Sequence, residues 1–222
     1  MIKMVVFDMA GTTVNEGNVV YKTLRQAINE RGYNVTLGEV LEKGAGREKL
    51  QAVKSVLNLN EADDNETANE IYKNFVELLG KAYDVYDILP QENALEVFHA
   101  LKQKQILVVL NTGYNAATAQ SLIDKIGWKI GEDYDSLVTA DDVEKNRPHP
   151  DMILLAMSQA GIESANEVAK VGDSIIDIME GKNAGCSFTI GITSGAHTME
   201  QLQSANPSYI INNLNELLPL LT

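Results

Sequence analysis

Cysteine is almost absent from this chain: Cys186 is the only one among 222 residues. A disulfide within the chain is therefore excluded, and the three histidines do not combine with that cysteine at the spacing of a zinc site. Long apolar runs are also missing. None approaches the roughly 20 residues that cross a bilayer, and the first residues lack the length and cleavage site of a signal peptide. We expect a protein of the reducing cytoplasm with no membrane segment.

Positive charge is scarce as well, with 18 lysines and arginines against 31 acidic residues and a formal net charge of −13. Such a chain repels nucleic-acid phosphates at long range, so we do not expect nucleic acid as a partner. An anionic substrate would need local cations and backbone amides. The hydrophobic share of 45% and the charged share of 22% are typical of a globular protein that buries one core, with room for a smaller inserted domain.

The spacing of apolar residues changes its period along the chain. Residues 2–7 have the pattern of a buried strand, whereas residues 18–79 follow helical spacing with no convincing strand. Thr36 and Glu39 have the form of a capping box that opens one of these helices. The polar segment 63–65, Asp-Asp-Asn, indicates the start of a longer one. This stretch is predicted to form a small helical bundle.

After about residue 86, strand and helix patterns alternate. Helices are predicted at 92–103, 115–126, 150–160 and 175–184, and strands at 106–110, 136–139, 167–171, 187–192 and 209–211. The alternation predicts an α/β fold: a doubly wound, Rossmann-like parallel sheet with an inserted helical domain. We expect residues 1–14 and 86–222 to form the α/β core and residues 15–85 the insertion. Ligands of such sheets collect beyond the carboxyl ends of the strands.

Polar residues follow the predicted strands at several of these ends. Asp8 ends the first strand and opens the loop 8–13, whose small residues let backbone N–H groups converge on an anion. The alternative is a tight turn with a capping aspartate. Thr112 and Gly113 follow the strand at 106–110 and would provide a second phosphate contact, although Thr-Gly is also common in turns.

A cation and two further carboxylates complete the pattern. Arg147, just before Pro148, is suited to orient a carboxylate or pair with phosphate oxygens, or it is a surface arginine. Asp173 follows a buried strand, and Asp177 lies four residues later. Hard oxygen ligands at this place suit Mg²⁺. The alternative is an N-capping aspartate with a second acid in the first helical turn.

Taken in order, these segments resemble the motifs of the haloacid dehalogenase-like hydrolase superfamily. The resemblance covers almost the whole chain, and the helical insertion is similar to the cap domain of that superfamily. It implies that Asp8 attacks phosphorus and forms an aspartyl-phosphate, which water then hydrolyses. It also implies Mg²⁺ held by Asp8, the backbone carbonyl of Ala10 and Asp173, with Asp177 in support.

The resemblance assigns the remaining motif residues to the phosphoryl group and to the nucleophile. Thr112 and the amides of Gly11, Thr12 and Gly113 would bind phosphoryl oxygens, and Arg147 would neutralise and position Asp8.

Two positions depart from the common pattern of the superfamily. Typical phosphatases carry a second aspartate, which protonates an alcohol leaving group, where this chain has Ala10. They also carry lysine at the position of Arg147. Both changes match the phosphonoacetaldehyde hydrolase branch, which cleaves a carbon–phosphorus bond.

That branch uses a cap lysine that forms a Schiff base with the substrate aldehyde. The segment 46–49, Gly-Arg-Glu-Lys, resembles its cap motif, which makes Lys49 the candidate amine and Gly46 a substrate contact. Lys49 lies in the first turn of a predicted helix beside Arg47, and both the helix end and this cation should lower its pKa. The alternative is an exposed surface lysine. The motif has methionine and histidine where this chain has Ala45 and Ala52.

Three functions follow from this reading. The first is Mg²⁺-dependent hydrolysis of phosphonoacetaldehyde or a related 2-oxoalkylphosphonate, a small anionic phosphorus-containing substrate. The second is a phosphomonoesterase of the same superfamily, and the third a non-catalytic binding protein. The resemblance also suggests a homodimer that pairs through the cap. Trp128 is expected to pack in the core, and His99, His149 and His197 to lie on the surface or in loops.

Overall fold

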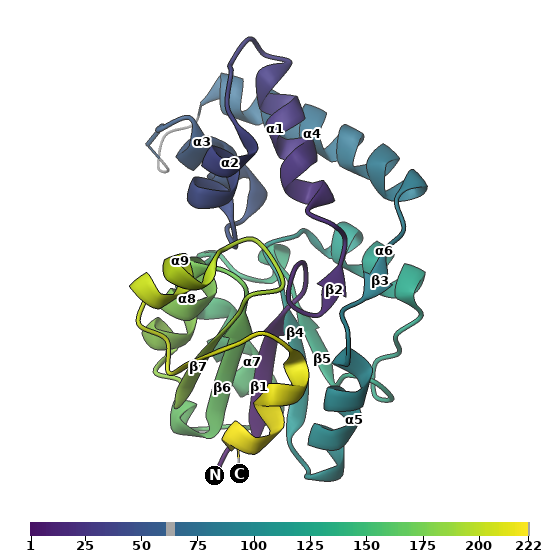
Figure 1. The fold of residues 1–222 in the computed structure, drawn as a ribbon, viewed down its shortest axis with the longest axis vertical. Helices are drawn as coiled ribbons and strands as arrows, with labels where there is room; N and C mark the ends of the chain where they lie inside the picture. Colours follow the sequence, from purple (N-terminus) through teal and green to yellow (C-terminus); the bar gives the residue numbers. More distant parts are fainter. Residues whose placement is uncertain (61–64, 222) are drawn as a thin grey trace.

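The computed structural model describes residues 1–60 and 65–221 of the chain. These residues form two parts: a sheet covered by helices, and a bundle of helices that lies beyond the carboxyl ends of the strands (Figure 1). None of the described helices is long and apolar enough to span a membrane.

The strands of the main sheet run parallel in the order β5-β4-β1-β6-β7-β8. Their bounds are β1 Met4–Asp8, β4 Leu107–Asn111, β5 Ser136–Val138, β6 Val168–Gly172, β7 Phe188–Ile192 and β8 Tyr209–Ile211. The doubly wound parallel sheet predicted from the sequence is therefore confirmed. Its first strand, β1, lies inside the sheet between β4 and β6, so that Asp8 is surrounded by the ends of its two neighbours.

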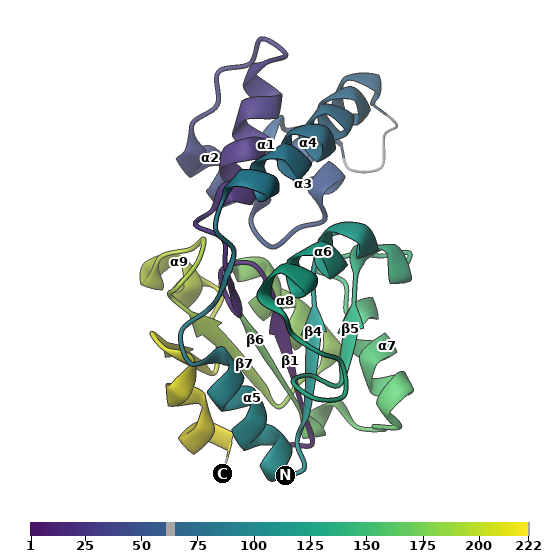
Figure 2. The same ribbon diagram turned by 90° about the vertical axis from the view of Figure 1, so that its right-hand side faces the viewer.

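Both faces of β1 are buried, because helices cover the sheet on either side (Figure 2). The covering helices are α5 Ala94–Gln103, α6 Ala116–Ile126, α7 Asp151–Ala160, α8 Ile175–Ala184 and α9 Met199–Ser204. On one face, Phe7 packs against Phe98 of α5 with ring centroids 5.2 Å apart, and Phe98 contacts Trp128 edge-on. On the other, Val6 shares a cluster with Ile153 of α7. Trp128 is a packing residue, as predicted.

The bundle consists of α1 Val19–Asn29, α2 Leu37–Gly44, α3 Lys49–Val56 and α4 Glu66–Val85. Buried apolar residues at helical spacing hold it together, among them Leu24 and Ile28 of α1 and Ile71 and Phe75 of α4. Within the described part of residues 18–79 every element is a helix, as the apolar spacing predicted.

Local capping explains where two of these helices begin. The Thr36 hydroxyl accepts the Glu39 N–H at 3.2 Å, and the Glu39 carboxylate accepts the Thr36 N–H at 2.8 Å, which confirms the predicted capping box. The Asn65 side chain caps α4 by accepting a backbone N–H of its first turn at 3.0 Å. Asp63 and Asp64, also predicted to open this helix, lie outside the described residues.

The two connections between sheet and bundle lie side by side. β2 Val14–Asn15 pairs with β3 Leu89–Pro90 as an antiparallel ribbon. These two-residue strands, α9 and the 3₁₀ helix Leu214–Leu221 were not predicted. A strand of two residues leaves no periodicity to detect, and Pro219 interrupts the helical pattern of the last segment.

Candidate active site

The carboxyl ends of β1, β4 and β6 bring the predicted acidic residues together. The register pairs Asp8 with Asn111 on one side and Phe7 with Val171 on the other, so Asp173 follows β6 directly beside Asp8. Asp8, Asp173 and Asp177 each offer a carboxylate oxygen, and these oxygens lie within 4.8 Å of one another. All three side chains are buried.

Burial and mutual repulsion perturb these carboxyls in different directions. Burial, followed by the charge of Asp177, raises the pKa of Asp8, and burial together with Asp8 and Asp177 raises the pKa of Asp173 well above its ordinary value. Burial also acts on Asp177, but the cations Lys170 and Arg147 outweigh it, and its pKa is lowered.

Arg147 connects the nucleophile candidate with two acids of α8. Its Nη1 lies 2.6 Å from Asp8 Oδ1 and 3.0 Å from Asp177 Oδ1, and its Nε lies 3.0 Å from Glu180 Oε2. Only 1% of its side chain is exposed, so the surface alternative is wrong. Burial acts to lower the pKa of Arg147, but Glu180, Asp177 and Asp8 outweigh it and raise that pKa, so the guanidinium stays charged.

Lys170 and Glu180 were not predicted to belong to the site. Lys170 Nζ lies 3.0 Å from Asp177 Oδ1 and 3.3 Å from Glu180 Oε2, and it donates to Asn111 Oδ1 at 2.7 Å. Two signals in the sequence could have revealed the pair. A lysine interrupts the buried strand Val168–Gly172, and Glu180 lies three residues after Asp177 on the same face of α8.

The donor set fits a divalent cation. The network contains four buried carboxylates and two buried cations: Asp8, Asp173, Asp177 and Glu180, with Arg147 and Lys170. When all six groups are ionised, the four carboxylates exceed the two cations by two negative charges. A divalent cation would balance this excess, and Mg²⁺ prefers hard oxygen ligands of this kind. The Asp177 carboxylate already accepts the Ser174 hydroxyl at 2.5 Å and pairs with both cations, which suits a supporting role. Asp173 accepts the Ala196 N–H at 2.6 Å through one oxygen.

The loop after Asp8 is a tight turn in which two of the predicted phosphate-binding amides are used. The Gly11 N–H donates to the Val14 carbonyl at 2.9 Å, and the Thr12 N–H donates to the Met9 carbonyl at 3.1 Å. In this structure these two amides therefore form the hydrogen bonds of a tight turn, the alternative to a phosphate-binding loop. The Thr12 hydroxyl differs: it is buried and has no hydrogen-bond partner among the described residues, so it is the group of this loop suited to bind an oxyanion.

A second predicted phosphate contact lies at the end of β4. Thr112 is buried, and its hydroxyl oxygen accepts the Tyr114 N–H at 3.2 Å. A Cβ atom at Gly113 would lie 2.6 Å from the Arg47 carbonyl oxygen of the bundle, so the sheet and the bundle approach each other closely at a residue without a side chain.

Other contacts also join the bundle to the site. The Gly46 carbonyl accepts from Arg147 Nη1 at 3.4 Å, whereas the Gly46 N–H donates within the bundle to the Tyr21 hydroxyl of α1 at 3.1 Å. His197 lies in a loop, as expected, but it is buried rather than on the surface. Its Nδ1 accepts the Ile175 N–H at 3.0 Å, and its Nε2 lies 3.0 Å from the Leu41 carbonyl oxygen of α2. His197 therefore bridges sheet and bundle.

Lys49 is buried at the start of α3, so the alternative of an exposed lysine is wrong. Its Nζ donates to the Arg47 carbonyl at 2.6 Å and lies 5.0 Å from the centroid of the Tyr114 ring. Its pKa is lowered, as predicted, although the largest cause is burial; Arg147 also lowers it, while Asp8 and Glu48 act in the opposite direction. The Glu48 carboxylate caps α3 by accepting the N–H groups of its first turn at 2.9 Å.

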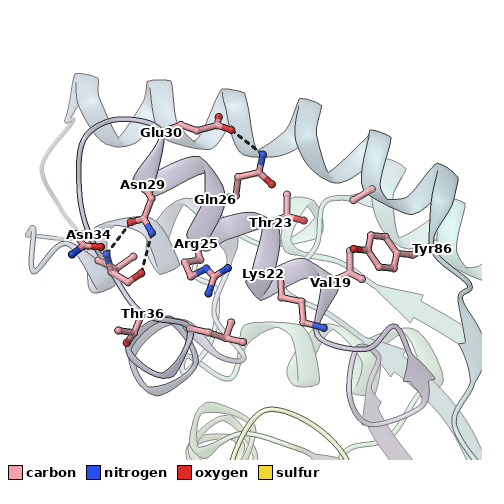
Figure 3. Close-up of a pocket in the computed structure, with 13 residues that line it drawn as sticks. Val19, Lys22, Thr23, Arg25, Gln26, Asn29, Glu30, Asn34, Thr36 and Tyr86 are labelled. Atoms are coloured by element: carbon pink, nitrogen blue, oxygen red, sulfur yellow. Dashed lines mark hydrogen bonds between the residues drawn. The ribbon is translucent and has the colours of Figure 1, made fainter.

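A groove of about 860 Å³ lies elsewhere, among the helices of the bundle (Figure 3). It is lined by residues of α1, of the segment that leads into α2, and of the end of α4, including Lys22 and Arg25. It contains none of the acidic residues or the cations described above, so it is separate from the candidate active site.

Comparison with known proteins identifies the class. The family model of the haloacid dehalogenase-like hydrolases matches residues 2–185, and the chain belongs to this family. It is therefore a hydrolase rather than a binding protein of the same fold.

Individual relatives agree with this class. The chain is 30% identical to a phosphonoacetaldehyde hydrolase of Bacillus cereus over 207 residues, which cover 88% of this chain and 77% of the relative. It is 29% identical to the probable phosphatase IndB of Dickeya dadantii, covering 98% of this chain and 92% of that protein. The crystal structure of a phosphonoacetaldehyde hydrolase-like protein from Oleispira antarctica has the same fold, with a TM-score of 0.83, 22% identity and coverage of 99% and 91%.

Proposed function

We propose that the protein hydrolyses the carbon–phosphorus bond of phosphonoacetaldehyde or a related 2-oxoalkylphosphonate. The observation that carries this proposal is the Lys49 amine, which is buried and has a lowered pKa on the segment that lies against Arg147 and Gly113. An amine that is easily deprotonated can attack an aldehyde. The similarity to phosphonoacetaldehyde hydrolases supports the same chemistry.

In this mechanism the Lys49 amine activates the aldehyde and the Asp8 carboxylate attacks phosphorus. The neutral Lys49 amine attacks the aldehyde carbon and, after loss of water, forms an imine. The Asp8 carboxylate attacks phosphorus while Arg147, at 2.6 Å, holds it in place. The carbon–phosphorus bond breaks, its electron pair passes into the imine, and the carbon departs as an enamine. No alcohol leaves in this step, so an acid at the position of Ala10 is not needed.

The remaining residues position the phosphoryl group. Asp8, the Ala10 carbonyl and Asp173 would hold Mg²⁺. Asp177 would support them, held by its hydrogen bond from Ser174 and its ion pairs with Arg147 and Lys170. When bound, this cation would cancel the repulsion between the Asp8 carboxylate and the phosphoryl oxygens. The hydroxyls of Thr12 and Thr112 are the proposed donors to those oxygens, with Gly113 beside them.

We further propose that residues 1–14 and 86–222 form the catalytic core and residues 15–85 a cap. The ribbon β2–β3 at the two connections is the proposed hinge, and release of the contacts at Gly46 and His197 would open the site to substrate. Pairing of two copies through the cap is also proposed, and sedimentation of the protein at increasing concentration tests it.

Trapping of the imine tests the function. The protein is incubated with phosphonoacetaldehyde and Mg²⁺, reduced with borohydride, and analysed by peptide mass spectrometry, while released phosphate is measured in parallel. We expect a reduced two-carbon adduct on Lys49 and phosphate release that Lys49→Ala abolishes. Asp8→Asn should lose phosphate release but still form the adduct. No adduct and no phosphate in the wild-type protein would rule out the proposal.

The second candidate is a phosphomonoesterase, favoured by the similarity to IndB and by Ala45 and Ala52, which stand where the cap motif of the phosphonoacetaldehyde hydrolases has methionine and histidine. A panel of sugar and nucleotide phosphates separates the two. Full turnover of an ester by Lys49→Ala, with no activity on the phosphonate, would support the esterase.

A further inference from the structure

A second group of buried titratable residues lies next to Lys49, apart from the carboxylate network. Glu16 precedes α1, Tyr83 belongs to α4, and Tyr114 follows β4. The hydroxyls of Tyr83 and Tyr114 are 2.7 Å apart, and the Tyr83 hydroxyl donates to Glu16 Oε2 at 3.5 Å. Tyr114 presents its ring to the Lys49 amine at 5.0 Å. All of these side chains are buried.

We infer that Glu16, acting through the hydroxyls of Tyr83 and Tyr114, supplies and takes back the proton that imine formation at Lys49 requires. The inference rests on the proposed function. It assigns an acid–base group to a step that the carboxylate network does not serve.

Glu16 suits this task because it is a buried acid without an ion pair in the described part of the chain. Burial raises its pKa, although the Val20 N–H, Lys49 and Tyr83 act against that rise, so Glu16 exchanges its proton nearer to neutral pH than an exposed glutamate. Asp8, Glu48 and Asp177 also act on the Lys49 amine. Asp8 and Asp177 belong to the carboxylate network, and both oxygens of Glu48 accept N–H groups of α3.

The two tyrosines suit a relay rather than an acid–base role of their own. Burial and their neighbours, including Glu16, raise the pKa of Tyr83 and of Tyr114 well above the ordinary value. Both phenols therefore stay protonated, and a proton moves by exchange of hydrogen bonds from hydroxyl to hydroxyl. The further ionisable groups that act on Glu16 or on this pair are Lys49, Lys22 and Tyr21.

The proton balance of the step is simple. Attack of the Lys49 amine on the aldehyde forms the nitrogen–carbon bond, and the proton released by nitrogen passes to the former carbonyl oxygen. The carbon–oxygen bond of this carbinolamine then breaks. Protonated Glu16 donates to Tyr83, Tyr83 to Tyr114, and Tyr114 to the departing hydroxyl, which leaves as water. The products are a cationic imine and the Glu16 carboxylate. Cleavage of the carbon–phosphorus bond turns this imine into the neutral enamine, and a proton from solvent adds to the enamine carbon and re-forms the cationic imine. Its hydrolysis by water frees the Lys49 amine and the aldehyde and returns one proton to Glu16.

Glu16 has a structural contact that the test must preserve. Its Oε2 accepts the Val20 N–H at 2.8 Å and so helps to start α1. Glu16→Gln keeps an oxygen acceptor at this place and removes the exchangeable proton. Tyr83→Phe leaves the Val20 contact untouched and interrupts the relay. Tyr134→Phe, which alters a buried tyrosine within the α6–β5 connection, is the matched control.

The experiment measures the rate of borohydride-trapped adduct on Lys49 with phosphonoacetaldehyde across a pH series, and thermal melting confirms folding. Glu16→Gln and Tyr83→Phe should each slow trapping by about 100-fold, the usual size of a general acid–base contribution. Glu16→Gln should also remove one limb of the pH profile, which loss of a helix cap would not do. Tyr134→Phe should match the wild-type protein. If Glu16→Gln fails to fold, Tyr83→Phe alone decides.

Wild-type rates and an unchanged pH profile in both variants would overturn the relay while leaving the proposed function intact. A slow Tyr83→Phe beside an unaffected Glu16→Gln would overturn the assignment of the proton to Glu16. Absence of any adduct in the wild-type protein would instead remove the proposed function, and the relay with it.

Discussion

Arg147 Nη1 lies 2.6 Å from Asp8 Oδ1, and the same guanidinium contacts Asp177 and Glu180 of α8. Because Asp8 ends β1 and the two acids belong to α8, one buried side chain fixes the nucleophile candidate relative to the proposed metal ligands. The planar guanidinium reaches three acids from two nitrogens that face different directions, whereas a lysine ammonium presents all its donors from one atom.

Arg147→Lys should therefore lower both activity and stability. We expect about 1–3 kcal/mol less free energy of unfolding, since at least one buried carboxylate loses its partner, and the measurement is urea unfolding. Arg31→Lys is the control, because its ion pair with Glu70 is exposed and should change stability by less than about 0.5 kcal/mol. Equal losses in the two variants would contradict the role of Arg147.

Gly46→Ala should impair closure of the bundle onto the sheet. Gly46 has a φ of +75°, and a Cβ there would collide with the Ser174 side chain. Gly32 has a φ of +88° but nothing within 4 Å of a Cβ, so Gly32→Ala has the same backbone strain without the collision. We expect a raised KM and a larger radius of gyration by X-ray scattering for Gly46→Ala alone. Identical KM and radius of gyration in the two variants would show that backbone strain, and not the collision with Ser174, causes the change.

Lys49→Met should stabilise the protein in a pH-dependent way. Burial lowers the pKa of Lys49 in the folded state, so at low and neutral pH folding disfavours the ammonium that the unfolded chain holds freely. Stability of the wild-type protein should rise with pH from the folded pKa up to the ordinary lysine value of 10.5. The advantage of Lys49→Met should accordingly shrink as pH approaches that value. Urea unfolding at several pH values measures it, and a constant difference would contradict the burial argument.

Mg²⁺ should stabilise the wild-type protein and not Asp173→Asn. The pKa of the Asp173 carboxyl is raised in the folded state. The protonated carboxyl therefore favours the folded protein below pH 3.8, the ordinary pKa of aspartate, and this contribution is lost as pH rises through the pKa of the folded state. Without metal, Asp173→Asn should therefore be the more stable protein near neutral pH. With Mg²⁺ at about 100 times its dissociation constant, the wild-type protein should gain about 2.7 kcal/mol. Thermal melting with and without Mg²⁺ checks both statements, and equal shifts would place the ion elsewhere.

Much of the fold was predictable because its causes are local. The alternation of buried strands with amphipathic helices, the capping box at Thr36 and the strand that ends in Asp8 can each be recognised within a few residues. The site was predictable where residues follow parallel strands, since neighbouring strands end at one edge of the sheet.

Other parts of the site depend on contacts between distant segments. Lys170 is a single charged residue in an apolar strand, which the sequence does not connect with the acidic residues. His197 has the sequence context of a loop residue, and only the tertiary structure shows its contact with the Leu41 carbonyl of α2. Glu16 and Tyr83 are 67 positions apart, and no spacing rule connects them.

By itself, the sequence determined the class of fold, the order of the main-sheet strands and the strand ends where Asp8, Thr112 and Asp173 lie, because hydrophobic period and capping act over a few residues. Only the tertiary structure decided which charged side chains are buried and what faces them. Burial shifts the pKa of Lys49 and gathers four carboxylates around two cations, and both depend on segments that fold against one another from far apart in the chain.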